Sequence, residues 1–101
     1  MKTADQVAAR ELYLYAVNDA GLYHSHTQPI IANLAKKRRR GIYDQDKALI
    51  LWGYLADDAA KRYNKEHGTG TRWFELFTVA TRSETARELA AHYAEELAED
   101  A

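Results

Sequence analysis

Apolar residues recur every three or four positions from Ala48 to Tyr63, and this stripe limits the possible folds more than any other feature of the sequence. The stripe consists of Ala48, Leu51, Trp52, Leu55, Ala59 and Tyr63, and Leu49, Ala56 and Ala60 widen it. Such spacing places side chains on one face of an α-helix. We therefore expect a long central helix whose apolar face is buried.

Polar residues and a glycine mark the ends of this helix. Asp44 is the expected N-cap, and Asp46 lies in the first turn, where a carboxylate interacts favourably with the helix dipole. The helix is expected to end at His67-Gly68. Gly53 lies inside the helix and costs roughly 1 kcal/mol relative to alanine. A close approach of another helix at Gly53 would offset this cost.

Two more helices are expected before the central one. Thr3 and Gln6 have the spacing of a capping box, and the segment Asn18-Asp19-Ala20-Gly21 indicates a helix end with Gly21 as a left-handed cap. Pro29 is expected near the start of the second helix, where its missing N–H costs nothing. Gly41 is expected to end that helix. The segment from 22 to 28 between the two helices is ambiguous between a helical turn and a loop.

The last third of the chain predicts a short aromatic turn and a final helix. Residues 73–77 are too few for an independent helix, and we expect a helical turn that fills part of the core. Thr81 and Glu84 form a second capping-box pattern, and the helix after them is expected to run to about Glu99. Its expected inner face consists of Ala86, Leu89, Ala90, Tyr93 and Leu97.

The sequence thus predicts an all-α fold: a single helical domain over residues 1–101, built as a compact bundle of about four helices with a short aromatic turn between the last two. One proline and five glycines leave few breaks. The absence of cysteine excludes disulfides and thiolate metal sites. We expect a cytoplasmic protein, within the host cell if a phage encodes it, and no membrane partner.

Five consecutive cations, Lys36-Lys37-Arg38-Arg39-Arg40, precede Gly41 in a chain of formal net charge −1. Residues 1–42 carry seven Lys and Arg against three Asp and Glu, whereas residues 43–101 carry seven against twelve. Three interpretations stay open for the basic run. It is a favourable helix C-terminus, a contact for nucleic-acid phosphates, or a contact for an acidic protein surface.

Seven tyrosines are a high count for a chain of this length, and several flank the basic run in sequence. Aromatic and basic side chains together can bind single-stranded nucleic acid. The simpler interpretation is that most tyrosines seal the edge of the core with their hydroxyls in water. Tyr13 and Tyr54 fall off the inward stripes, and an exposed tyrosine patch would suit a protein interface.

No catalytic constellation is evident. His24 and His26 are expected to be exposed loop residues, and His67 and His92 helix-surface residues. The pairs Asp57-Asp58 and Glu95-Glu96 are adjacent on helices, where neighbouring side chains diverge by roughly 100°. General acid–base catalysis needs convergent groups. The sequence therefore predicts no enzyme, no metal site and no cofactor.

A series of short motifs in residues 10–90 resembles a family of small uncharacterised helical proteins of tailed phages and prophages. The matching segments are Asn18-Asp19-x-Gly21-Leu22-Tyr23, Pro29-Ile30-Ile31-x-Asn33-Leu34 with Lys37, Gly41-x-Tyr43-Asp44 with Lys47-Ala48, Ala60-Lys61-x-Tyr63-x-Lys65-Glu66, and the aromatic segment around Trp73 and Phe77. The resemblance implies a viral or mobile-element origin and little chemistry. Among the matched residues, Gly21, Pro29, Gly41 and Tyr43-Asp44 are also expected helix boundaries.

Together, these patterns predict a non-enzymatic accessory protein of phage type that binds a macromolecule, with a host or phage protein as its partner. The alternative is nucleic-acid binding through the basic run. In either case the candidate binding residues are Lys36, Lys37, Arg38, Arg39, Arg40 and Tyr43. The sequence leaves the oligomeric state open.

Overall fold

The fold is all-α, as predicted. A computed structural model describes residues 3–100, with side chains to residue 98, and no strand occurs in that range. The elements are α1 (Ala4–Asn18), α2 (Ala20–Leu22), the π-helical turn η1 (Tyr23–Thr27), α3 (Gln28–Arg39), α4 (Gln45–His67), α5 (Trp73–Leu76) and α6 (Val79–Asp100). The last helix is expected to run to about Glu99, and the side chains of Glu99 and Asp100 lie outside this description.

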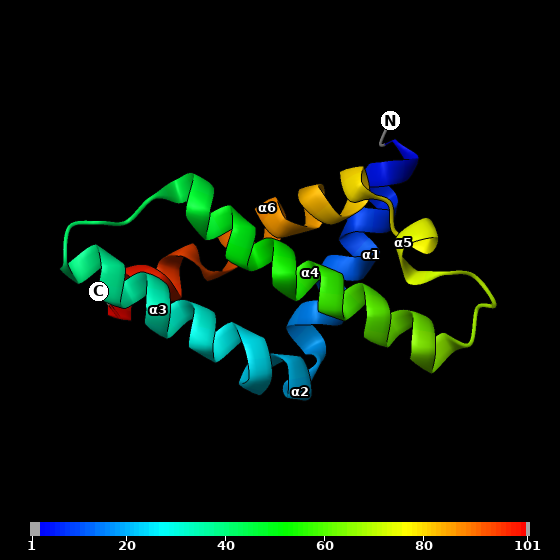
Figure 1. Cartoon of the computed structure of the whole chain (residues 1–101), viewed down its shortest axis with the longest axis horizontal. Helices are drawn as coiled ribbons and strands as arrows, with labels where there is room; N and C mark the ends of the chain where they lie inside the picture. The colour runs from blue at the N-terminus through cyan, green and yellow to red at the C-terminus, as the bar shows by residue number, and fades with distance from the viewer. Residues whose placement is uncertain (1–2, 101) are drawn as a thin grey trace.

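The long helices α4 and α6 run antiparallel along the molecule, and α1 packs against both (Figure 1). The three helices share a core in which Leu12, Leu55 and Leu89 have no solvent exposure. Helix α3 lies beside α4 and also contacts α6, where it contributes the buried side chains of Ile30, Ile31, Leu34 and Ala35. The predicted apolar stripe of the central helix therefore faces the core.

Most predicted helix boundaries are confirmed. The Thr3 hydroxyl accepts from the Gln6 N–H, and the Gln6 side chain accepts from the Thr3 N–H, which is the predicted capping box. The Asp44 carboxylate accepts from two backbone N–H groups in the first turn of α4. Gly41 (φ +71°) and Gly68 (φ +55°) take positive φ angles just after α3 and α4, in the left-handed region that glycine adopts without steric cost.

The predicted role of Gly21 is wrong. Helix α1 ends at Asn18 as expected, but the chain then turns at Asp19, which has an extended backbone (φ −94°, ψ 112°). The Asp19 carboxylate accepts from the Leu22 N–H at 2.8 Å and so begins a new helix. Gly21 lies inside that helix, and an aspartate N-cap replaces the expected left-handed glycine cap.

The second capping box, predicted at Thr81 and Glu84, is also wrong. Helix α6 begins at Val79, and the hydroxyl of Thr78 accepts from the Thr81 N–H at 3.3 Å. Thr81 is buried instead, and its hydroxyl donates to the Asp5 carboxylate at 3.2 Å. This bond ties α6 to the first turn of α1, a role that local sequence spacing cannot indicate.

The ambiguous segment before Pro29 is a π-helical turn that joins α2 to α3 without a break. The Gln28 N–H donates to the Tyr23 carbonyl, five residues earlier. In an ordinary helix the ring of Pro29 would clash with the carbonyl four residues before it, and a wider turn relieves such a clash. Leu22, Thr27 and Ile31 are all buried. Because of the extra residue in the turn, the first two are five positions apart, whereas Thr27 and Ile31 are four positions apart, as in a regular helix.

The aromatic segment forms the short helix α5 and fills part of the core, as predicted. Phe77, directly after α5, is 3% exposed, and its ring contacts Tyr63 edge-on. Trp73 is half-buried, with the Lys61 ammonium 5.0 Å and the Arg82 guanidinium 4.8 Å from its ring centre. Cations over the indole face are favourable, so α5 is held at the end of the bundle by its aromatic side chains.

Candidate functional site

The basic run forms the last turn of α3, as predicted. Lys36 to Arg39 end the helix, and Arg40 is the C-cap residue. Lys36, Lys37, Arg38 and Arg40 form no ion pair with any carboxylate among the described side chains. All four positive charges lie near the C-terminus of α3, where the negative end of the helix dipole stabilises them. They therefore keep their charge available to a partner.

Tyr43 lies beside this run, as the sequence suggested. The Arg38 guanidinium carbon is 4.6 Å from the centre of the Tyr43 ring. Both side chains line a hollow of about 420 Å³ at the start of α4. The hollow is also lined by Gln45, Ala48, Leu49, Arg87, Ala90, Ala91 and Ala94. One end of the basic run thus opens into a recess between α4 and α6.

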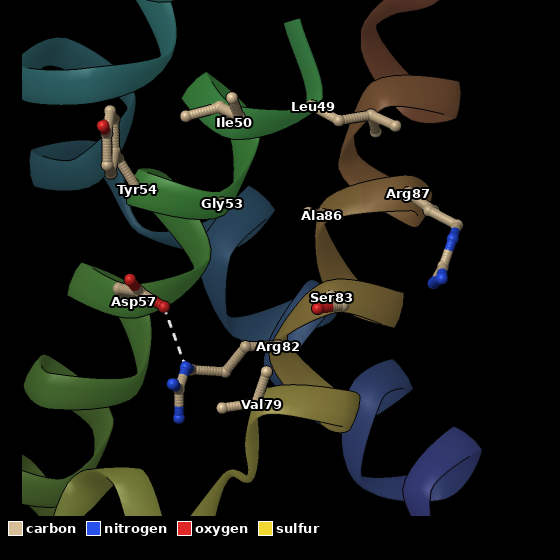
Figure 2. Close-up of a pocket in the computed structure, with 10 residues that line it drawn as sticks. All are labelled: Leu49, Ile50, Gly53, Tyr54, Asp57, Val79, Arg82, Ser83, Ala86 and Arg87. Carbon is tan, nitrogen blue, oxygen red and sulfur yellow. Dashed lines mark hydrogen bonds and ion pairs between the residues drawn. The ribbon is translucent and has the colours of Figure 1, made fainter. Parts of the chain in front are cut away.

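A second hollow of about 410 Å³ continues along the same two helices. Figure 2 shows its lining residues: Leu49, Ile50, Gly53, Tyr54 and Asp57 from α4, and Val79, Arg82, Ser83, Ala86 and Arg87 from α6. Leu49 and Arg87 line both hollows. We call the combined surface the α4–α6 groove.

Large apolar side chains border the groove without any cover among the described residues. Ile50 is 56% exposed, Tyr54 58% and Val79 69%. In Figure 2, Leu49 points from α4 towards α6, whereas Ile50 and Tyr54 lie along the opposite edge of α4. Clustered exposed apolar side chains of this kind mark interaction surfaces.

Gly53 lies in this groove, and no other described helix approaches it closely enough to offset the cost of glycine. A Cβ atom added at Gly53 would meet no atom within 4 Å. Its φ angle is not positive, so the backbone does not require glycine either. Within the described structure, Gly53 is therefore an unfilled position on the floor of the groove.

Charge is distributed unevenly along the groove. At one end Arg82 donates to the Asp57 carboxylate at 2.8 Å and to the Phe77 carbonyl at 2.5 Å, so these charges satisfy one another. At the other end lie Arg87 and Arg38. Arg87 contacts Glu84 at 3.0 Å on the surface, and exposed pairs of this kind are weak. The groove runs from an apolar, neutral end to a cationic end.

Most tyrosines lie at the edge of the core, as predicted, but their hydroxyls bond to side chains where water was expected. The bonds are Tyr13 to His92, Tyr15 to Glu66, Tyr23 to Glu96 and Tyr63 to Glu11, at 2.7, 2.7, 3.2 and 2.5 Å. Tyr13 is half-buried and is not part of an exposed patch. Tyr54 is the tyrosine whose side chain makes no hydrogen bond or ring contact with the described residues.

These contacts change the acidity of three phenols. Burial, together with the hydrogen bond to Glu66, raises the pKa of Tyr15 well above its ordinary value. The hydrogen bond to Glu11 and then burial raise the pKa of Tyr63. Burial raises the pKa of Tyr93, whose ring stacks on Trp52 at 5.3 Å. The Tyr15 and Tyr63 hydroxyls donate to carboxylates, which favours the neutral form of both phenols.

His26 is not the exposed loop residue that the sequence predicted. It lies in η1, where its Nε2 contacts the Asp58 carboxylate and its Nδ1 is 2.6 Å from the Ser25 hydroxyl. A hydroxyl, an imidazole and a carboxylate also occur in series in hydrolase triads. Acyl transfer needs free donors for the oxyanion, whereas the N–H groups of a helical turn are used within the helix. We therefore assign His26 and Asp58 a structural role in joining η1 to α4.

The remaining histidines are exposed and lie on different elements. His24 contacts Gln28, His67 contacts the Tyr63 carbonyl, and His92 contacts Tyr13. The adjacent acids Asp57 and Asp58 of α4 point in different directions, as predicted. Asp57 accepts from Arg82, and Asp58 contacts His26. No group of three or more His, Asp or Glu among residues 3–98 is placed to hold a metal ion.

Comparison of the chain with protein-family models, curated proteins and solved structures gives no match. Within residues 3–100, no helix combines the length and the apolar character that crossing a membrane requires. The site must therefore be argued from its own geometry. Sequence reasoning identified Arg38, Tyr43 and Tyr54 but missed Ile50 and Val79. The sequence did contain an indication that Ile50 and Val79 are exposed, because both are large apolar residues outside the inward stripes.

Proposed function

We propose that this protein is a non-enzymatic interaction domain that binds a partner protein in the α4–α6 groove. The observation that carries the proposal is the cluster of exposed Ile50, Tyr54 and Val79 around an unfilled glycine. Burial of a large apolar side chain is worth about 1.5–3 kcal/mol. Tyrosine is also one of the residue types that most often contribute strongly to binding at protein interfaces.

Capture from cell lysate tests this proposal when wild type and surface variants are compared. We propose a phage-type origin, so the lysates are bacterial, with and without phage infection. A protein retained by the wild type should be lost with Tyr54→Glu, because the variant places a charge in the apolar end of the groove. Val7→Glu is the matched control, since Val7 is 56% exposed on α1 and does not line the groove. Equal retention by both variants would refute the groove as the binding site.

Nucleic-acid binding is the second candidate, and one specific observation favours it. Lys36, Lys37, Arg38 and Arg40 are free of described carboxylates, and Tyr43 lies under Arg38. Phosphate contacts of this kind weaken steeply with salt. Titration of labelled single- and double-stranded DNA and RNA at low and moderate salt tests it. Absence of binding at low salt would rule it out.

A further inference from the structure

We infer that the partner segment in the α4–α6 groove is an amphipathic helix that is apolar at one end and acidic at the other. This inference rests on the proposed function and names the chemistry of its partner. Three features of the groove support it: its length, its floor of small residues and its uneven charge.

The groove has the dimensions of a docked helix. It extends along α6 from Val79 to Ala94, which at 1.5 Å per residue is about 22 Å, or four helical turns. Its lining residues come mainly from α4 and α6, which run in opposite directions (Figure 1). Helices bind in such grooves through apolar side chains at spacings of three, four and seven residues.

The floor of the groove allows a helix to approach closely. Its residues are small: Gly53 on α4 and Ser83, Ala86, Ala90, Ala91 and Ala94 on α6. Large partner side chains can therefore enter the two hollows, whose volumes of about 410 and 420 Å³ each exceed that of a single leucine or phenylalanine. Gly53 lies between Leu49, which both hollows share, and the exposed Tyr54, where a partner backbone could come nearest to α4.

Charge complementarity fixes the second property of the partner. Four charged residues line the groove: Arg38, Asp57, Arg82 and Arg87. Because Asp57 and Arg82 pair with each other, the net charge is positive and is concentrated at the end formed by Arg38 and Arg87. The rest of the basic run extends the same potential. An acidic turn of the partner would meet this end, while its apolar residues cover Ile50, Tyr54 and Val79.

Selection from a displayed library of random 16-residue peptides tests the inference and does not require the natural partner to be identified. The immobilised protein is the full chain. We expect enriched peptides with apolar residues at helical spacing and Asp or Glu at one end. Binding of the enriched peptides should be lost with Gly53→Leu, which fills the floor. It should weaken about tenfold or more when Arg38→Glu and Arg87→Glu are combined.

A charge-matched control separates local from overall electrostatics. The double variant Lys65→Glu with Arg72→Glu changes the net charge equally, but neither residue lines the groove. Its peptide affinity should stay within about twofold of wild type. Circular dichroism and thermal unfolding confirm that each variant is folded before binding is measured.

The outcomes distinguish the inference from the proposed function. The inference would be overturned, and the groove kept as an interface, if the peptides whose binding Gly53→Leu abolishes carry no acidic residues. Normal binding of those peptides to the Arg38 and Arg87 double variant would have the same meaning. Enrichment of no groove-dependent peptide would overturn both. Displacement of the selected peptides by single-stranded nucleic acid would assign the groove to nucleic acid. Self-association of the protein that the peptides disrupt, measured by light scattering, would assign the groove to a second copy of the chain.

Discussion

Replacement of Gly53 by alanine should stabilise this protein by about 1 kcal/mol. Glycine in a helix interior is less favourable than alanine by about 0.8–1 kcal/mol, because it loses more backbone entropy on folding. The added methyl group meets no atom within 4 Å, and the φ angle at Gly53 is not positive, so neither a clash nor backbone strain opposes the gain. For a domain of about 100 residues, 1 kcal/mol corresponds to a rise in Tm of about 4–8 °C.

Urea unfolding followed by circular dichroism at 222 nm measures this change. With an m-value of about 1–3 kcal/mol/M, the midpoint should rise by about 0.3–1 M at unchanged slope. Gly21→Ala is an informative control, because its methyl group would lie 2.6 Å from the Arg62 guanidinium and displace it from Asp19. Gly68→Ala is a second control, and its φ of +55° predicts a loss of stability.

A destabilised Gly53→Ala variant would refute this reasoning. It would mean that α4 is approached closely at Gly53 in solution, either by another part of the chain or by a second copy. An increase of stability with concentration in the wild type, absent in Gly53→Ala, would point to the second copy. A gain of about 1 kcal/mol with weaker partner binding is the expected combination, because the methyl group raises the floor of the groove.

Three further predictions concern the core, a helix cap and alkaline pH. Leu55→Ala should lower the free energy of unfolding by about 3–5 kcal/mol, since Leu55 is fully buried, and urea titration measures it. Asp44→Ala should cost about 0.5–2 kcal/mol through loss of the N-cap, with Asp44→Ser recovering most of it in the same assay. Burial and Glu66 raise the pKa of Tyr15 above the ordinary 10.0, so its contribution is complete below pH 10 and declines above it. Tyr15→Phe should flatten the fall of stability between pH 10 and 12, and an unchanged slope would argue against the Glu66 contact.

The fold was largely predictable because local chemistry determines most of it. The apolar stripe of α4 repeats over enough residues to predict both a helix and its buried face. Asp44 caps the start of this helix and Gly68 caps its end, each through hydrogen bonds to nearby residues. The predictions failed where a local motif competed with a better one. Asp19 displaced Gly21 as the boundary after α1, and Thr78 displaced Thr81 as the cap of α6.

The candidate site was less predictable, because it depends on how two helices pair. The sequence placed Tyr43 beside the basic run, since both flank Gly41. It could not show that Arg38 and Arg87 line one hollow, or that Tyr54 and Val79 line the other, because this depends on how α3, α4 and α6 pack together. The contact of His26 with Asp58 was missed for the same reason, as the two residues are 32 positions apart.

The π-helical turn at Tyr23–Thr27 acts as a phase shift between two helical faces. An extra residue in a helix rotates everything after it by roughly 100°. Leu22 is buried directly before the turn, and Ile30, Ile31, Leu34 and Ala35 are buried in the helix after it. Deletion of one residue from the turn would bring the ring of Pro29 against the carbonyl four residues before it and would also move those side chains away from the core. It would also rotate the basic run about the axis of α3, so the direction in which Arg38 points depends on a single extra residue more than ten positions earlier.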